Sequence, residues 1–431
     1  MSQSTVVGGN PWSAYMLDIY RSRRGPQPLG TVVFEEIEAK AREKLKDYGG
    51  AFMYAGGSAG SNSTYRANVA QFAKWGIIPR MLVNATRRSL ETTIFGVTHL
   101  SPLLIAPIGV QAIFHPDAEF SPARAAKALG VPYILSTAAS RTIEEIAEAN
   151  GDGHRWFQLY WPRTNEVTLS LLKRAKENNY KALVVTLDTM SLGWRPHDLE
   201  TAYIPFGHGV GVQIGKSDPI FMARYGKQPV TEHPEFPYDA AKFDQGVVAG
   251  DPKAKEGLFF GMEWLKEANS GLYRDWNDLK FLRDNWEGPL ILKGIQSAHD
   301  AEKALEHGVD GIIVSNHGGR QVDGAIPSLL ALELIMRSIK VKEAQEAGKL
   351  TILFDSGIRT GSDIFKALAL GAQAVLLGRP WLYGSIVGGQ AGVEQVIKHT
   401  LADLDNTLGL AGYTSVAEIQ GKGQEVIARI A

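Results

Sequence analysis

The sequence predicts an α/β protein built on a (β/α)8 TIM barrel, with an N-terminal helical extension and a long insertion after the fourth strand. From Ser101 onward, short runs rich in Val, Ile and Leu alternate with helical stretches. Strands that are apolar throughout and separated by helices are typical of a parallel sheet covered on both faces. Eight such units fit a closed barrel better than a doubly wound sheet, and no G-x-G-x-x-G follows the first strand.

Residues 1–100 are expected to form a helical arm that packs on the barrel. Phe34–Tyr48 has apolar residues at helical spacing and ends at two glycines, which predicts an amphipathic helix. A flexible loop of small residues is predicted at 54–60. A second helix should follow with Val69 and Phe72 on its buried face, and after it short extended pieces.

Residues 101–431 are expected to form the barrel itself. Its predicted strands are Leu103–Ala106, Pro132–Ser136, Trp156–Tyr160, Ala182–Asp188, Leu290–Lys293, Gly311–Ser315, Leu350–Asp355 and Ala374–Gly378. The insertion at 189–275 has no clear periodicity, so it is either a functional lid or a partly disordered loop. Because it leaves the carboxyl end of a strand, it lies on the face where barrel active sites are found.

Composition excludes several classes of function. Lys and Arg number 45 against 46 Asp and Glu, so nothing indicates a nucleic-acid or acidic membrane partner. The absence of cysteine excludes disulfides, thiolate nucleophiles and iron–sulfur clusters. Ten scattered histidines predict no metal site. Met1–Trp12 has no secretory pattern and no apolar run is long enough to span a membrane, so we expect a cytoplasmic protein.

Polar side chains gather where the predicted strands end, and in a barrel these ends meet at one mouth. Singly, each could be a helix cap or a solvated loop residue. Three cations at one mouth of a near-neutral chain nevertheless indicate anionic ligands. The set comprises Pro107, Ile108, Gly109, Ser136, Gln158, Tyr160, Thr186, Asp188, Lys293, residues 315–320, residues 355–359, Gly378 and Arg379.

Two anion sites can be separated within this set. Residues 355–361 and 378–379 follow the seventh and eighth strands, where barrels often hold a phosphate. His317 and Arg320 form the second site, since an imidazole can remove a proton beside a carboxylate held by arginine. Lys293 could stabilise a developing anion or form a Schiff base, as in a barrel lyase, and these residues alone leave both open.

The motifs resemble the FMN-dependent α-hydroxy acid oxidizing family. Its signature S-N-H-G-x-R-Q stands at Ser315–Gln321, and the likeness runs roughly from Phe34 to the end. A-G-G-S, A-P-I-G-V and L-K-G-I-Q make the chain most similar to the lactate 2-monooxygenase branch. The supporting motifs, in order, are I-A-P at 105–107, Q-L-Y at 158–160, T-L-D-T at 186–189, L-K-G at 292–294, D-S-G-I-R-T-G at 355–361 and G-R-P at 378–380.

The resemblance implies FMN as cofactor, a 2-hydroxy acid and O2 as substrates, and a homotetramer or homo-octamer. His317 would be the catalytic base, oriented by Asp188, and Lys293 would stabilise the reduced flavin. The implied substrate-binding residues are Tyr54 (or Met53 in its place), Tyr160, Arg195, His317 and Arg320. The implied cofactor-binding residues are Pro107, Ile108, Gly109, Ser136, Gln158, Thr186, Lys293, Ser315, Asp355, Gly357, Arg359, Gly378 and Arg379.

Two small residues refine the expected reaction. Family oxidases tend to have alanine where Gly109 stands, which favours a monooxygenase that decarboxylates its product over an oxidase that releases 2-oxo acid and H2O2. Ala138 stands where glycolate oxidase has a bulky aromatic residue, which implies a substrate at least as large as lactate. The segment 189–275 would then be a lid over the active site.

Overall fold

The computed structural model describes residues 11–430, so most of Met1–Trp12, on which the expected absence of a secretory signal rests, lies outside it. Eight parallel strands close into a barrel in the order β10-β11-β4-β5-β6-β7-β8-β9. The predicted barrel is therefore confirmed. The strands are β4 (Leu103–Ile105), β5 (Tyr133–Ser136), β6 (Arg155–Leu159), β7 (Leu183–Thr186), β8 (Leu290–Ile295), β9 (Gly311–Val314), β10 (Thr351–Phe354) and β11 (Ala374–Leu377).

Both faces of these strands are buried, because alternate side chains point into the barrel and out to the helices. One core cluster fills the interior with a side chain from every strand: Leu104, Ile134, Trp156, Val184, Ile291, Ile313, Leu353 and Leu376. Neighbours such as Leu103 and Ile105 belong to the larger cluster between strands and helices. The barrel is thus a packed core, and the polar strand ends are left at its rim.

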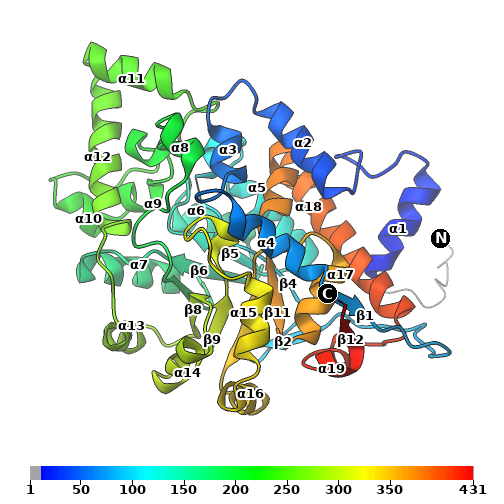
Figure 1. Ribbon diagram of the computed structural model, residues 1–431. Coiled ribbons are helices and arrows are strands. Elements are labelled where there is room, and N and C mark those ends of the chain that lie inside the picture. The colour runs from blue at the N-terminus through cyan, green and yellow to red at the C-terminus, as the bar shows by residue number, and fades with distance from the viewer. Residues whose placement is uncertain (1–10, 431) are drawn as a thin grey trace.

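Helices surround the barrel (Figure 1). They are α5 (Phe120–Leu129), α6 (Ile143–Asn150), α7 (Asn165–Glu177), α13 (Leu279–Asn285), α14 (Ala298–Glu306), α15 (Ser328–Ile335), α16 (Ile339–Glu346), α17 (Gly361–Ala369) and α18 (Arg379–Leu410), with a kink in α18 at Gly388 and Gly389. Short 3-10 turns occupy Gln111–Ile113 (η1), Trp276–Asp278 (η3), His317–Gly319 (η4) and Val416–Glu418 (η5). None of the helices in the described part is long and apolar enough to cross a membrane.

The N-terminal hundred residues contain α1 (Pro11–Ser22), α2 (Phe34–Lys44), α3 (Ala51–Gly56), α4 (Ser63–Phe72), β1 (Trp75–Ile77), β2 (Thr92–Ile94) and β3 (Val97–His99). β1 pairs antiparallel with β12 (Ile427–Arg429), which follows α19 (Gly423–Val426), so the arm is joined to the last strand of the chain. Two predictions here were wrong. Tyr54 lies on α3 instead of in a loop, and Val69 is 39% exposed, whereas Phe72 is buried as expected.

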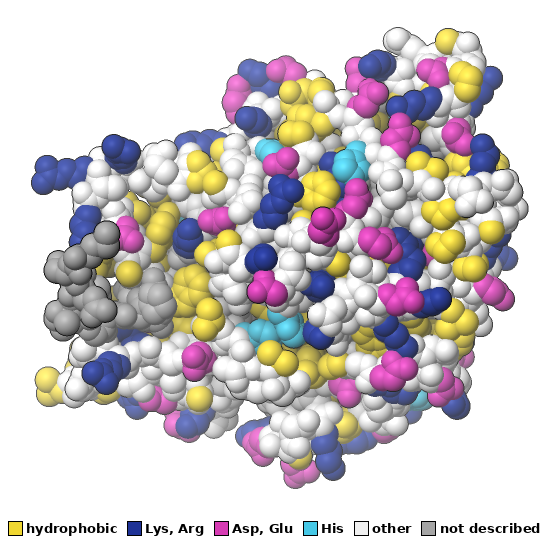
Figure 2. Space-filling model, turned by 180° about the vertical axis from the view of Figure 1, so that it is seen from behind, with side chains coloured by type: hydrophobic (Ala, Val, Ile, Leu, Met, Phe, Trp, Pro, Cys, Tyr) yellow, Lys and Arg dark blue, Asp and Glu magenta, His cyan; other side chains and the backbone are white. Residues whose placement is uncertain are grey.

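The insertion is largely helical, so the prediction of an irregular loop was wrong. It contains α8 (Pro196–Glu200), η2 (Pro205–His208), α9 (Gln213–Lys216), α10 (Pro219–Ala223), α11 (Ala240–Ala249) and α12 (Pro252–Ala268). α11 and α12 lie on one side of the molecule and α1 on the other (Figure 1). On the face shown in Figure 2, basic and acidic side chains are interspersed, in line with the net charge of −1.

Candidate active site

A cavity opens at the carboxyl ends of the barrel strands. Its empty volume, including the open mouth, is about 1290 Å³. The barrel, the arm and the insertion all contribute to its walls. Predicted site residues on its lining are Tyr54, Pro107, Ile108, Gly109, Tyr160, Arg195, Lys293, His317, Arg320, Asp355, Gly357, Arg359, Gly378 and Arg379.

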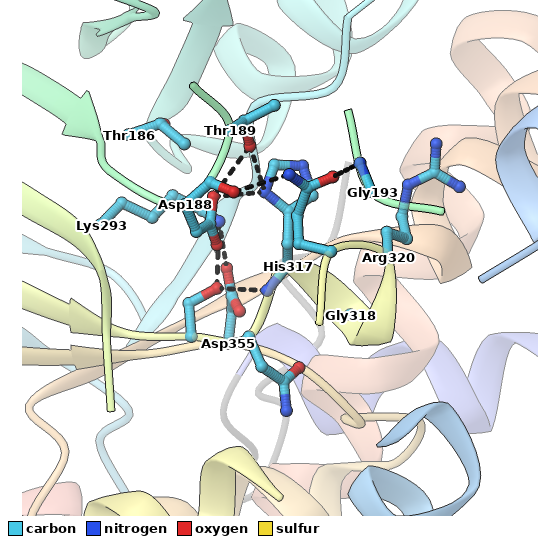
Figure 3. A network of polar contacts seen from close by, with 12 residues as sticks. Thr186, Asp188, Thr189, Gly193, Lys293, His317, Gly318, Arg320 and Asp355 are labelled. Carbon is cyan, nitrogen blue, oxygen red and sulfur yellow. Dashed lines mark hydrogen bonds and ion pairs between the residues drawn. The ribbon is translucent and has the colours of Figure 1, made fainter. Parts of the chain in front are cut away.

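His317 and Asp188 form a hydrogen-bonded pair at the centre of the site (Figure 3). Nδ1 of His317 lies 2.9 Å from Oδ1 of Asp188, and the Thr189 hydroxyl donates to the same oxygen at 2.9 Å. Because a carboxylate only accepts, Nδ1 carries the proton and Nε2 is left to accept one. The backbone of His317 has a φ of +57°, a conformation uncommon for residues other than glycine.

Burial and charge keep this imidazole neutral. Burial lowers the pKa of His317, and the positive charge of Lys293 lowers it further, while Asp188 opposes both. Burial alone would raise the pKa of Asp188, but His317, Lys293 and Thr189 lower it to about 2. A neutral imidazole beside a fixed carboxylate is suited to act as a general base near neutral pH.

Lys293 lies on the opposite side of His317 from Arg320 (Figure 3). Its Nζ donates to the Ser315 hydroxyl at 3.0 Å and lies 3.2 Å from Oδ2 of Asp355. Burial favours the neutral amine, but Asp355 and Asp188 outweigh it and raise the pKa of Lys293. The lysine is therefore a charged ammonium, suited to stabilise an anion.

Four arginines also line the cavity, namely Arg195, Arg320, Arg359 and Arg379. Nε of Arg379 donates to the Ala55 carbonyl, and its Nη2 donates to the Gly57 carbonyl. Nη1 of Arg320 donates to the same two oxygens, at 3.2 and 2.9 Å. Burial, followed by the charges of Arg195 and Arg379, lowers the pKa of Arg320 to about 9. These cations thus cluster against the arm.

Within residues 11–430, no Asp or Glu oxygen lies within 4.0 Å of the guanidinium group of Arg320, Arg359 or Arg379, although the backbone N–H of Arg359 donates to Asp363. Buried charges are normally paired. Their natural counter-charges in this cavity are anionic ligands, and planar guanidinium groups bind phosphate and carboxylate through two parallel hydrogen bonds.

Comparison with known proteins identifies the chemistry. A family model described as FMN-dependent dehydrogenase matches residues 41–426. The chain belongs to this family. An FMN-dependent alpha-hydroxy acid dehydrogenase of Penicillium citrinum is 45% identical over 89% of this chain and 87% of its own length. The crystal structure of a lactate oxidase of Pediococcus acidilactici superposes with a TM-score of 0.73 at 32% identity, covering 92% of this chain and 94% of that one. A mandelate oxidase structure has a TM-score of 0.71 at 32% identity over 90% and 97% of the two chains.

The protein is thus an FMN-dependent α-hydroxy acid oxidoreductase, as the sequence motifs predict. The residues present fit FMN, since unpaired arginines at the ends of β10 and β11 suit its phosphate. Five predicted site residues are not among those that line the cavity: Ser136, Gln158, Thr186, Asp188 and Ser315. Ser136 donates to Gln158 at 2.9 Å, and Gln158 donates to Thr186 at 2.9 Å, so a buried polar row spans three strand ends. Such a row suits the polar edge of a flavin ring in this FMN-dependent dehydrogenase.

Two tyrosines, Tyr54 and Tyr160, line the same cavity. Burial raises the pKa of Tyr54 to about 12 and also raises the pKa of Tyr160, so both phenols remain protonated donors. Met53 is absent from the lining, and its Sδ lies 3.4 Å from Nη1 of Arg42 instead.

Sequence reasoning missed residues that hold the FMN-dehydrogenase site together. The Gln321 side chain donates to the carbonyls of Asp188 and Ser191 and accepts from Arg195, joining the start of the insertion to the signature loop. Asp323 accepts hydrogen bonds from Ser61 and Ser63 at the start of α4. Gln321 belongs to the signature and could have been found there. Asp323 stands outside every quoted motif.

Asn68 and Asn316 form a second link between the arm and the signature loop. Each amide donates to the other's oxygen, at 2.8 and 2.7 Å, in a buried reciprocal pair. The arm is therefore fixed to the loop that carries His317 and Arg320.

Proposed function

We propose that the protein oxidises an L-2-hydroxy acid, lactate or larger, with O2 as the final electron acceptor. The observation that carries the proposal is the placement of a neutral, carboxylate-oriented His317 in one cavity with arginines that lack carboxylate partners. Bound FMN would supply the two-electron redox chemistry that connects oxidation of the hydroxy acid to reduction of O2.

The side chains of the protein divide the remaining work. Arg195 and Arg320 bind the substrate carboxylate, and the phenols of Tyr54 and Tyr160 donate hydrogen bonds to the carboxylate and hydroxyl. Nε2 of His317 accepts the proton that leaves the α-hydroxyl or the α-carbon of the substrate, and Asp188 stabilises the imidazolium that forms. Lys293 keeps a positive charge that would stabilise negative charge on a bound cofactor.

The same proposal includes decarboxylation of the product, on the strength of Gly109. In the structure, a Cβ at position 109 would lie 2.7 Å from Cβ of Ala138 and 2.9 Å from its carbonyl oxygen. Packing against Ala138 therefore requires glycine at position 109, independently of any influence of this residue on the reaction with O2. The yield of H2O2 per substrate consumed decides the outcome, since stoichiometric peroxide contradicts decarboxylation.

A lyase that uses Lys293 as a Schiff base is disfavoured. A nucleophilic lysine must be neutral, and the ion pair with Asp355 and the raised pKa hold Lys293 in its charged form.

The decisive experiment is anaerobic bleaching of the flavin absorbance by L-2-hydroxy acids. His317→Gln should keep the bound flavin and lose at least 100-fold in the rate of bleaching, because a general base typically contributes ~10²–10⁴-fold. His299→Gln on exposed α14 is the matched control. Bleaching by His317→Gln at the normal rate would remove His317 from the role of base.

The assembly follows from the family resemblance alone, and the location is the one expected from the sequence. We propose a cytoplasmic homotetramer or homo-octamer, which light scattering of the purified holoenzyme would measure.

The lid role of 189–275 is also part of the proposal. Leu192, Arg195, Phe206, Trp264 and Asn269 from this segment line the cavity.

A further inference from the structure

Phe206 is the aromatic residue of η2 that lines the cavity, and it is only 8% exposed. Its ring centroid lies 6.5 Å from that of Tyr54, at the substrate end of the site. A Cβ built on Gly211 would lie 2.9 Å from both Cε1 of Phe206 and Cγ2 of Val110, and 3.1 Å from the Ala138 carbonyl. The ring therefore extends from Tyr54 toward the strand-end loops that carry Val110 and Ala138.

Two glycines of α12 determine this position. A Cβ on Gly261 would lie 2.2 Å from the Phe206 carbonyl oxygen, and one on Gly257 would lie 3.4 Å from the His208 carbonyl oxygen. Any larger residue at 261 would push η2 away from the helix. Because the main chain of η2 packs directly on the main chain of α12, the backbone that carries the Phe206 ring is fixed by this contact.

The surroundings of Phe206 are apolar. Trp264, Leu265 and Ala268 from the end of α12 line the cavity with it, as does Ala138. The charged residues of the cavity come from the strand ends, apart from Arg195 at the start of the insertion. The part of a substrate that meets Phe206 is therefore neither the carboxylate nor the reacting hydroxyl.

We propose that Phe206 selects the substrate side chain and that the preferred substrates are 2-hydroxy acids with a branched aliphatic or aromatic side chain. This inference rests on the proposed function. Each further CH2 buried against such a wall contributes ~0.8 kcal/mol, or about fourfold in binding. A second carboxylate would be buried there without a charged partner, which is costly.

The test is anaerobic flavin reduction of the holoenzyme with L-lactate, L-2-hydroxy-4-methylpentanoate, L-3-phenyllactate and L-malate. We expect the two larger apolar acids to exceed lactate at least tenfold in the second-order rate of reduction, with malate slowest. Phe206→Ala should remove at least tenfold of the rate with the larger acids and less than threefold with lactate. Phe206→Leu, which keeps η2 apolar, should give an intermediate ratio.

Phe243→Ala is the matched control, because Phe243 lies in the same insertion, stacked on His208 at 4.3 Å and absent from the cavity lining. It should keep the wild-type ratio of large to small substrates. Three results would overturn the inference: a wild-type preference for lactate or malate, an equal loss with all substrates in both Phe206 variants, or a ratio changed equally by Phe243→Ala. If no hydroxy acid reduces the flavin at all, the proposed function itself fails, and the inference with it.

Discussion

Asp188→Asn tests how much the buried carboxylate contributes to catalysis. The surroundings lower the pKa of Asp188 from 3.8 to about 2 despite its burial, and His317 is the strongest of the lowering influences. One pKa unit corresponds to ~1.36 kcal/mol, so an interaction of this kind is worth on the order of 2 kcal/mol. The same interaction stabilises the imidazolium that forms during catalysis. We therefore expect Asp188→Asn to lower the rate of flavin reduction by about 10- to 60-fold.

The pH dependence separates this explanation from misfolding. His317 acts in its neutral form, so the rate should rise with pH through its pKa and then reach a plateau. Asp188 raises the pKa of His317. Removing the negative charge should therefore move the rise to lower pH while the plateau falls. A misplaced but chemically unchanged imidazole would lower the plateau without moving the rise.

The assay is anaerobic stopped-flow reduction at saturating substrate between pH 4.5 and 9. Thr189→Val is a useful companion, because it removes one hydrogen bond to Asp188 and keeps its charge. It should lower the plateau less than Asp188→Asn does. A plateau within twofold of wild type, or a rise displaced to higher pH, would refute the reasoning.

Three further predictions concern binding, packing and stability. Arg320→Lys should raise KM at least tenfold, because a point charge cannot bind the arm carbonyls and a carboxylate together; an unchanged KM in steady-state kinetics removes Arg320 from the carboxylate site. Gly109→Ala should destabilise the protein by ~1–3 kcal/mol, since its Cβ would meet Ala138 at 2.7 Å. An unaltered urea midpoint would show that the segment around residue 109 can shift without cost. Burial lowers the pKa of His399 in the folded protein to about 4. As the pH falls below 6.5, this imidazole is protonated in the unfolded chain before it is protonated in the folded one. Up to ~3 kcal/mol of the free energy of unfolding is therefore lost between pH 6.5 and 4. In urea unfolding at pH 7 and pH 4.5, His399→Leu should lose less free energy of unfolding between the two pH values than the wild type does. An equal loss in the variant contradicts the assignment of this pH dependence to His399.

Local patterns were sufficient to predict the barrel and to identify many of the residues that line one cavity at its rim. A strand buried on both faces is apolar at every position, so the runs at β7 and β9 could be recognised without knowledge of their neighbours. Closure of the barrel then placed His317, Lys293 and Arg379 at one mouth, as the order of the strands predicts.

The arm and the insertion were not predicted as well, because their helices are short and their contacts are unusual. α3 has only 6 residues, among small residues that favour a loop interpretation. α12 carries Gly257 and Gly261 where η2 rests against it, so its buried face lacks the apolar period of an ordinary helix.

The sequence by itself determined the barrel, the cofactor class and the identity of the residues at the strand ends. Only the tertiary structure decided how the arm reaches the site, through Asp323 with Ser61 and Ser63 and through Asn68 with Asn316, and that Phe206 lies beside Tyr54. The physical reason is separation along the chain. Periodicity reports on neighbours within one helix or strand, whereas hydrogen bonds between residues about 250 positions apart leave no local pattern.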